Sequence, residues 1–307
     1  MGMPLLAGSN CEAIELSFGV GELNAISRFE EAIFRHRRIL GEDELLCRYR
    51  AVSSRIMERL RLSPSRMNDF TNCPQLYKYR AIDLLPEPPS IDAERGKLIH
   101  SILEEIFELS MAERTYEKAV ELLPSIWARQ LESKPELSAL VLDEKEWFDR
   151  ARALLTNYFS LEKPETFEST YRELHLERDI SDEIYLHGYV DRLDVAPTGE
   201  VRIVDYKTGK SPKPGWEEKA LFQLRVYALL YWQNNGVLPR LLKLIYLGDS
   251  RVVESTPTEP QLKSTEKILN NIGQEILTAI ESSDFPTKKS RLCDWCFFKT
   301  ICPAHQN

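Results

Sequence analysis

The spacing of apolar residues along the chain changes from a helical period to a strand period and back again. The stretch ERGKLIHSILEEIFELS repeats apolar residues at the spacing of one helical face, and residues 115–160 continue that pattern. In contrast, TYRELHLERDI, EIYLHGYVDRLDVA and EVRIVDYKTG alternate polar with apolar positions, and PTGE forms a turn-rich break between the last two. The pattern therefore predicts helices followed by an antiparallel β-meander.

Helical spacing returns after the meander. A loop, KSPKPG, leads into the amphipathic stretch WEEKALFQLRVYALLYWQ, while LLKLIYLGD and RVVES are typical of strands and residues 259–282 of a long helix. Near the start, Ser63 is a helix cap before Pro64, and the short helix that follows ends at the Cys73-Pro74 break. This order of elements predicts an α/β fold in which helices pack on a mixed sheet.

Composition and length are those of a soluble globular protein, with 43% hydrophobic and 29% charged residues among 307. Residues 1–61 contain helical patches but no chemical motif, and we expect them to form an N-terminal extension of unknown role. Met57 is an alternative candidate for the start of translation. The functional domain is predicted to span residues 62–307.

Several classes of function are disfavoured by what the sequence lacks. No apolar run reaches the roughly 18 residues of a membrane span, and the N-terminus lacks a secretory signal, so we expect a cytoplasmic protein without a membrane partner. A net charge of −8 argues against coating a polyanion, although basic stretches such as KTGKSPK leave room for a local nucleic-acid groove. There is no GxxxxGK[ST] motif, so any helicase would be a separate partner.

Candidate chemistry appears where a predicted strand ends in RIVDYKTGK. Asp205 and Lys207 lie two residues apart and so share one face of the strand, and a hairpin would bring Asp191 close to Asp205. Two neighbouring carboxylates repel unless a cation lies between them, and hard oxygen ligands suit Mg²⁺ or Mn²⁺. Lys207 would then either help to deprotonate water or neutralise a phosphate. An acid and a lysine at this spacing are, by themselves, more typical of a surface salt bridge.

Four stretches in order, GKLIHSILE, GYVDRLDV, IVDYKTG and QLRVYALLY, resemble the motifs of RecB-type nucleases of the PD-(D/E)XK superfamily. The resemblance covers roughly residues 62–307 and implies a restriction-endonuclease-like core. It implies a divalent metal held by His100, Asp191, Asp205 and the backbone carbonyl of Tyr206. It also implies that Lys207 is catalytic and that Gln223 and Tyr227 position DNA or this lysine.

Weaker candidates surround this set. Glu104 lies four residues after His100 and so shares its helical face. A glutamate on an exposed helix surface is more often simply solvated, and the same expectation applies to Asp194, His187 and Arg192.

The cysteines suggest a second metal site. Cys293, Cys296 and Cys302 have the spacing of a short loop that wraps a metal, and Cys73, which also precedes a proline, is the natural fourth donor. Resemblance to AddB-type iron–sulfur nucleases and their CRISPR-associated relatives implies a 4Fe-4S cluster that clamps the two ends of the domain. Zinc is the alternative, with His305 able to replace one cysteine.

The sequence thus predicts a metal-dependent deoxyribonuclease, an exonuclease on single strands or DNA ends that acts in repair or recombination. One alternative is a non-catalytic DNA-binding scaffold, which the intact Asp191, Asp205 and Lys207 disfavour. An RNA-directed nuclease or a CRISPR spacer-acquisition enzyme would share the same motifs.

Overall fold

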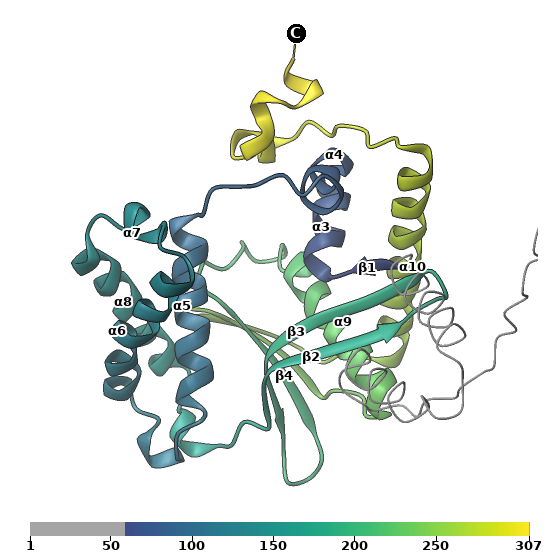
Figure 1. Ribbon diagram of the computed structural model, residues 1–307. Helices are drawn as coiled ribbons and strands as arrows, with labels where there is room; N and C mark the ends of the chain where they lie inside the picture. The colour runs from purple at the N-terminus through teal and green to yellow at the C-terminus, as the bar shows by residue number, and fades with distance from the viewer. Residues whose placement is uncertain (1–58, 307) are drawn as a thin grey trace, which may run out of the picture. The chain divides into compact units, whose positions relative to one another are not determined.

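The computed structural model describes residues 59–306. The chain divides into two compact units, Met1–Leu60 and Arg61–Asn307, and the second carries all the elements that form the site (Figure 1). The expected N-terminal extension, residues 1–61, lies almost entirely outside the described residues.

Six strands in the described part of the chain form one mixed sheet. They are β1 (Leu60–Leu62), β2 (Tyr171–Asp179), β3 (Ile184–Val195), β4 (Val201–Lys207), β5 (Leu241–Tyr246) and β6 (Arg251–Ser255). The order is β1-β3-β4-β5-β6, with β2 also paired to β3. The pairs β2–β3 and β3–β4 are antiparallel, which confirms the predicted meander, whereas β4 and β5 are parallel. A parallel pair requires a crossover, and helix α9 (Glu218–Asn235) supplies it.

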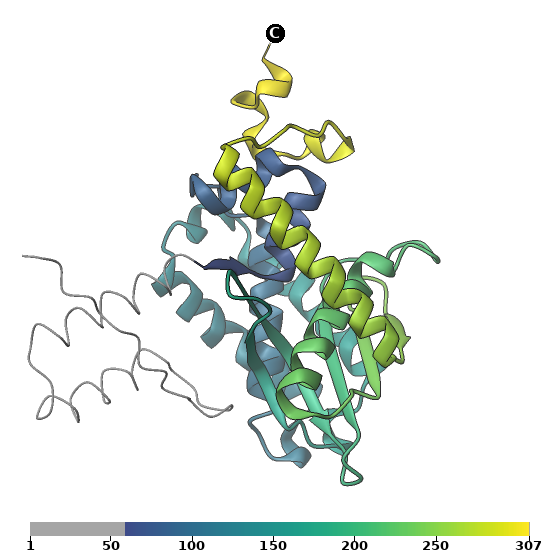
Figure 2. The ribbon, with the colours of Figure 1, turned by 90° about the vertical axis from the view of Figure 1, so that its right-hand side faces the viewer.

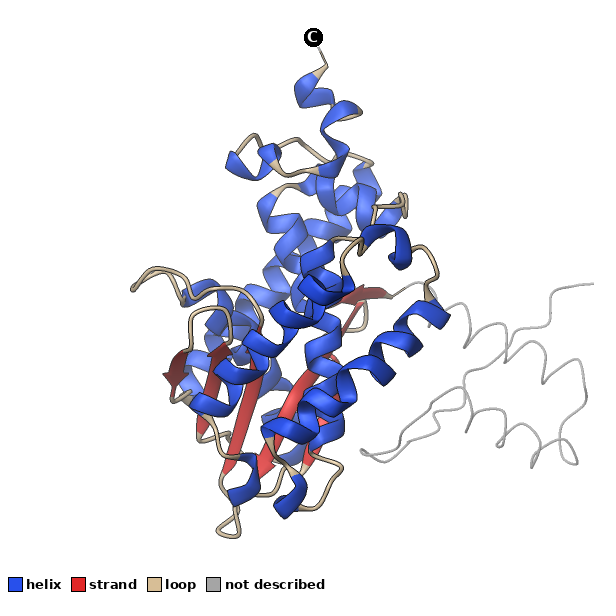
Figure 3. Ribbon diagram, turned by 90° about the vertical axis from the view of Figure 1, so that its left-hand side faces the viewer, coloured by secondary structure: helices blue, strands red, loops and turns tan. Residues whose placement is uncertain are grey.

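Helices cover both faces of this sheet (Figures 1 and 3). They are α3 (Pro64–Asn72), α4 (Pro74–Tyr77), α5 (Ile91–Ile106), α6 (Tyr116–Ser133), α7 (Leu137–Leu140), α8 (Glu144–Leu161), α9 (Glu218–Asn235) and α10 (Glu259–Ser282). Helices α5, α6 and α8 share a core with Val204 and Tyr206 of β4, whereas α9 packs on the other face and α10 packs on α9. Between residues 59 and 306, no helix has the length and apolar character needed to cross a membrane.

Two helix starts follow directly from capping residues. Ser63 accepts a hydrogen bond from the Arg66 amide and precedes Pro64, as the sequence predicted. Thr258 and Gln261 form a reciprocal capping box at the start of α10. These caps explain why both boundaries were predictable from local sequence.

A buried group of charges lies beneath the sheet, centred on Arg192 of β3. Its guanidinium is fully buried and lies 2.7 Å from Glu162, 3.2 Å from Asp194 and 2.5 Å from the Tyr206 hydroxyl. Lys243 of β5 approaches Glu162 within 2.9 Å. The expectation that Arg192 and Asp194 are solvated is therefore wrong, because α8 covers the face of the sheet on which they lie.

This group of charges predicts a specific loss of stability in acid. Burial would raise the pKa of Glu162, but Arg192 and Lys243 lower it from 4.5 to about 2. Because the unfolded state takes up the proton first, the stabilisation is complete above pH 4.5 and is lost as the pH falls towards 2. We expect urea unfolding to show a loss of about 3 kcal/mol over this range that the Glu162→Gln variant lacks. Equal acid sensitivity of the two proteins would contradict this.

Candidate metal centre and nuclease site

The site forms where strands β3 and β4 separate. Their last pair toward the site is Arg192 with Val204, and beyond it the ladder stops. Beyond that pair, the Asp191 carboxylate replaces the backbone partner: its Oδ2 accepts a hydrogen bond of 2.7 Å from the Tyr206 amide. This bond satisfies a backbone donor that the strand pairing leaves open and fixes the carboxylate in the gap.

Helix α5 brings His100 to the same gap. Its Nε2 lies 3.0 Å from the Tyr206 carbonyl oxygen, and its Nδ1 lies 3.5 Å from Asp191 Oδ1. Burial alone would lower the pKa of His100, but the hydrogen bond and charge of Asp191, with the charges of Asp205 and Glu173, raise it to about 9. The structure thus places His100, Asp191 and the Tyr206 carbonyl together, as the sequence analysis expected.

Glu173 of β2 is a further acid in the site, and the sequence analysis did not identify it. Arg172 pairs with Arg192 and Leu174 with Val190, so Glu173 stands opposite Asp191. Its φ of 44° is left-handed, a strained conformation for a non-glycine residue within a strand. Alternation along β2 gives the face of Glu173, but only the register with β3 places it opposite Asp191.

The closest group of potential ligands differs from the expected one. Among the described residues, one group of at least three His, Cys, Asp or Glu side chains has all its ligand atoms within 4.8 Å of one another. This group consists of His100, Glu173 and Asp191. Asp205 is not in this group, because its carboxylate is held by Lys207 and Gln223. It is near enough for its charge to act on His100.

The positive charges of His100 and Lys207 compensate the acids of this site only in part. Burial and then the charge of Asp191 raise the pKa of Glu173 to about 7, and the same two causes raise the pKa of Asp205 to about 6. Crowded carboxylates of this kind are stabilised by a cation. Carboxylate and carbonyl oxygens with one imidazole match the ligands of Mg²⁺ or Mn²⁺, so the residues present fit a divalent metal.

Asp205 and Lys207 are held by a chain of hydrogen bonds that runs onto α9. Lys207 Nζ lies 2.7 Å from Asp205 Oδ2 and donates to Gln223 Oε1 at 3.1 Å. The Gln223 amide donates in turn to Asp205 Oδ1 at 3.2 Å and to the Tyr227 hydroxyl at 2.9 Å. Gly188 makes room for Tyr227, since a Cβ there would lie 2.5 Å from the tyrosine ring.

The protonation state of Lys207 limits its role. Burial would lower its pKa, but the charge and hydrogen bond of Asp205 raise it above the ordinary value. This raised pKa favours the ammonium form of Lys207, which can stabilise negative charge or donate a proton.

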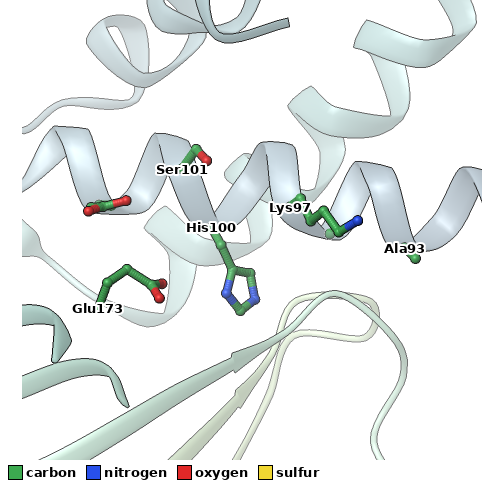
Figure 4. A pocket seen from close by; sticks show the side chains of 7 residues that line it. Ala93, Lys97, His100, Ser101 and Glu173 are labelled. Atoms are coloured by element: carbon green, nitrogen blue, oxygen red, sulfur yellow. The ribbon is translucent and has the colours of Figure 1, made fainter. Parts of the chain in front are cut away.

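A cavity of about 510 Å³ opens beside these residues along α5. Figure 4 shows the His100 ring and the Glu173 carboxylate pointing into the same space beneath this helix. The full lining consists of Ala93, Gly96, Lys97, His100, Ser101, Glu104 and Glu173. His100 and Glu104 both line it, so they share a face as their spacing predicted. Two of the candidate metal ligands, His100 and Glu173, thus line a cavity that opens to the surface.

The four cysteines near Tyr79 lie together. Cys73 Sγ accepts a hydrogen bond of 3.4 Å from the Lys288 amide, and the Tyr79 hydroxyl donates to the Ile301 carbonyl at 3.2 Å. Burial raises the pKa of Cys296, and the three neighbouring cysteines raise it further. These cysteines are Cys293, Cys302 and Cys73.

The fold and this site define a nuclease of one superfamily. The family model described as the PD-(D/E)XK nuclease superfamily matches residues 61–303, so the chain belongs to this superfamily.

Similar proteins come from phages and bacteria. The gene 69 protein of Mycobacterium phage L5 is 24% identical over 290 residues, covering 79% of this chain and 96% of its own. The gene 69 protein of Mycobacterium phage D29 is 25% identical over 270 residues, with the same coverage of 79% and 96%. The crystal structure of an exonuclease candidate from Eubacterium rectale has a TM-score of 0.54 at 15% identity, covering 83% of this chain and 91% of its own. At this identity the likeness concerns the fold alone.

Proposed function

We propose that this protein is a divalent-metal-dependent deoxyribonuclease that hydrolyses phosphodiester bonds at single strands or DNA ends. The observation that carries the proposal is the convergence of His100, Glu173 and Asp191 within 4.8 Å, beside the Asp205–Lys207 pair. The repair or recombination role expected from the sequence stays part of this proposal.

His100, Glu173, Asp191, Asp205 and the Tyr206 carbonyl would hold the cation. Mg²⁺ or Mn²⁺, when bound, lowers the pKa of water and stabilises negative charge on a phosphoryl group. Lys207 places its ammonium group beside Asp205, where it neutralises charge that develops on the phosphate. Gln223 fixes the direction of Lys207 through its 3.1 Å hydrogen bond, and Tyr227 holds Gln223.

The direct test is cleavage of labelled single-stranded DNA, duplex DNA and RNA with Mg²⁺, Mn²⁺ or EDTA. We expect DNA cleavage that requires the metal and that falls by at least about 100-fold in Asp191→Asn, because one charged ligand is lost. Asp182→Asn is the matched control, since Asp182 is exposed in the turn between β2 and β3. Cleavage of RNA alone would support an RNA-directed nuclease. Cleavage of neither DNA nor RNA would support a non-catalytic scaffold.

We also propose that Cys73, Cys293, Cys296 and Cys302 hold a 4Fe-4S cluster. The support is the mutual proximity of the four cysteines, since the other three all act on the pKa of Cys296. The cluster would tie the end of α3 to the C-terminal segment, which also contacts Tyr79 through Phe298 with ring centroids 5.0 Å apart. Its role would be structural.

Metal analysis of anaerobically purified protein tests this second proposal. We expect iron and sulfide in near-equal amounts and a broad absorption shoulder near ~400 nm. Cys73→Ser should lose both and lower the thermal midpoint, because a bound metal group contributes folding energy. Stoichiometric zinc without iron would overturn the cluster and leave the nuclease site untouched.

A further inference from the structure

The loop of residues 208–217 follows the strand that carries Lys207 and leads into α9, which carries Gln223. We call it the β4–α9 loop. In Figure 1 it crosses from the end of β4, beside α5, to the start of α9, and Figure 2 shows it projecting next to the first turn of that helix. Its first residue, Thr208, lies beside Gly96 of the cavity lining, since a Cβ at Gly96 would lie 3.3 Å from Thr208 Oγ1.

The first half of the β4–α9 loop is anchored to the turn after β5. The Leu247 amide donates to the Lys207 carbonyl at 2.8 Å, and the Gly248 amide donates to the Gly209 carbonyl at 3.1 Å. Position 248 requires glycine, because a Cβ there would lie 2.6 Å from the Gly209 backbone. Ser211 adds a 2.6 Å hydrogen bond to Asp249.

The second half is anchored as well. The Trp216 amide donates to the Lys213 carbonyl at 3.0 Å, and the Gly215 amide donates to the Glu217 carboxylate at 2.7 Å. At the start of α9, Lys219 Nζ donates to Asn72 Oδ1 at 2.9 Å. The loop is therefore braced at both ends, and its tip has a defined turn.

This braced tip presents one large aromatic ring to solvent. Trp216 is 76% exposed, although tryptophan is among the most strongly apolar side chains. Lys210 and Lys213 are exposed on the same loop, whereas the carboxylate of Glu217 binds the Gly215 amide and that of Glu218 binds Arg225. An exposed ring flanked by lysines matches a nucleic acid strand, with a base to stack on and phosphates to neutralise.

We infer that Trp216 stacks against an unpaired base of the DNA substrate while Lys210 and Lys213 contact its phosphates. A paired base inside a duplex has no exposed face, so the surface selects a single strand or a frayed end. The inference rests on the proposed nuclease function and assigns to the β4–α9 loop the recognition of the nucleotides next to the scissile bond.

Equilibrium binding of a fluorescently labelled oligo-dT strand and of a blunt duplex, in EDTA to prevent cleavage, tests the inference. We expect Trp216→Leu to weaken oligo-dT binding by about 5- to 100-fold, since base stacking on an aromatic ring is lost. Trp216→Phe keeps a ring at the same exposed position and should bind within a few-fold of the wild type. Affinity for the blunt duplex should be the same in all three proteins.

Two results would overturn the inference. Oligo-dT affinity of Trp216→Leu equal to that of the wild type would exclude stacking, and an equal loss for the blunt duplex would indicate a contact that does not need an unpaired base. Both results are measured without cleavage, so they are independent of the nuclease proposal. If the wild type binds oligo-dT through Trp216 but cleaves no nucleic acid, the nuclease proposal fails and the stacking inference stands.

Discussion

Replacing Lys207 by alanine is expected to lower the rate constant for DNA cleavage by about 100- to 10,000-fold, the range for loss of a group that stabilises charge or donates a proton in the transition state. Lys207 Nζ lies 2.7 Å from Asp205 and 3.1 Å from Gln223, so its position is fixed before substrate binds. Single-turnover cleavage at saturating DNA and Mg²⁺ measures this step without product release.

Two controls separate chemistry from folding in this variant. Lys207→Ala should keep the circular dichroism spectrum of the folded wild type, and it should bind a divalent metal, since Lys207 supplies no ligand. Lys243→Ala is the matched lysine control, because Lys243 pairs with Glu162 beneath the sheet. Unchanged single-turnover cleavage in Lys207→Ala would contradict the role assigned to Lys207.

Replacing Arg192 by methionine should cost about 3–5 kcal/mol in the free energy of unfolding, the range for removing one partner of a buried ion pair. The guanidinium is fully buried between Glu162, Asp194 and the Tyr206 hydroxyl, so its loss leaves acids beneath the sheet without a partner. Urea unfolding followed by circular dichroism measures the change.

The reason for this loss can be tested by also removing the carboxylate that Arg192→Met leaves unpaired. The double variant Arg192→Met with Glu162→Gln should recover part of the lost stability, because a neutral amide replaces the unpaired carboxylate. Arg178→Met, at a partly exposed arginine that binds Gln233 and Asn234, should cost far less. A double variant as unstable as the sum of its two single variants would contradict the explanation.

Much of the fold could be predicted from local sequence. Helix α10 spans Glu259–Ser282, as its amphipathic pattern predicted, because the capping box at Thr258 fixes its start. Strands β2 to β4 were predictable from alternation, and the shared face of Asp205 and Lys207 follows from the period of a strand. These features depend on residues that are near one another in the chain.

Other features depend on partners that are distant in sequence. Arg192 was expected in solvent, yet it is buried against Glu162 of the loop after α8. Lys243 of β5 also pairs with Glu162. Glu173 was missed because its left-handed backbone conformation and its approach to His100 arise only in the folded chain. Alternation specifies the face of a strand, but not which helix covers that face.

Equilibrium binding of Mn²⁺, followed by electron paramagnetic resonance of the free ion, tests the central claim most directly. We predict a Mn²⁺ site in the wild type that Lys207→Ala keeps and that Asp191→Asn weakens by about 10- to 100-fold or more. Mn²⁺ binding of unchanged affinity in Asp191→Asn would show that the gap between β3 and β4 does not hold the metal, and would contradict the account.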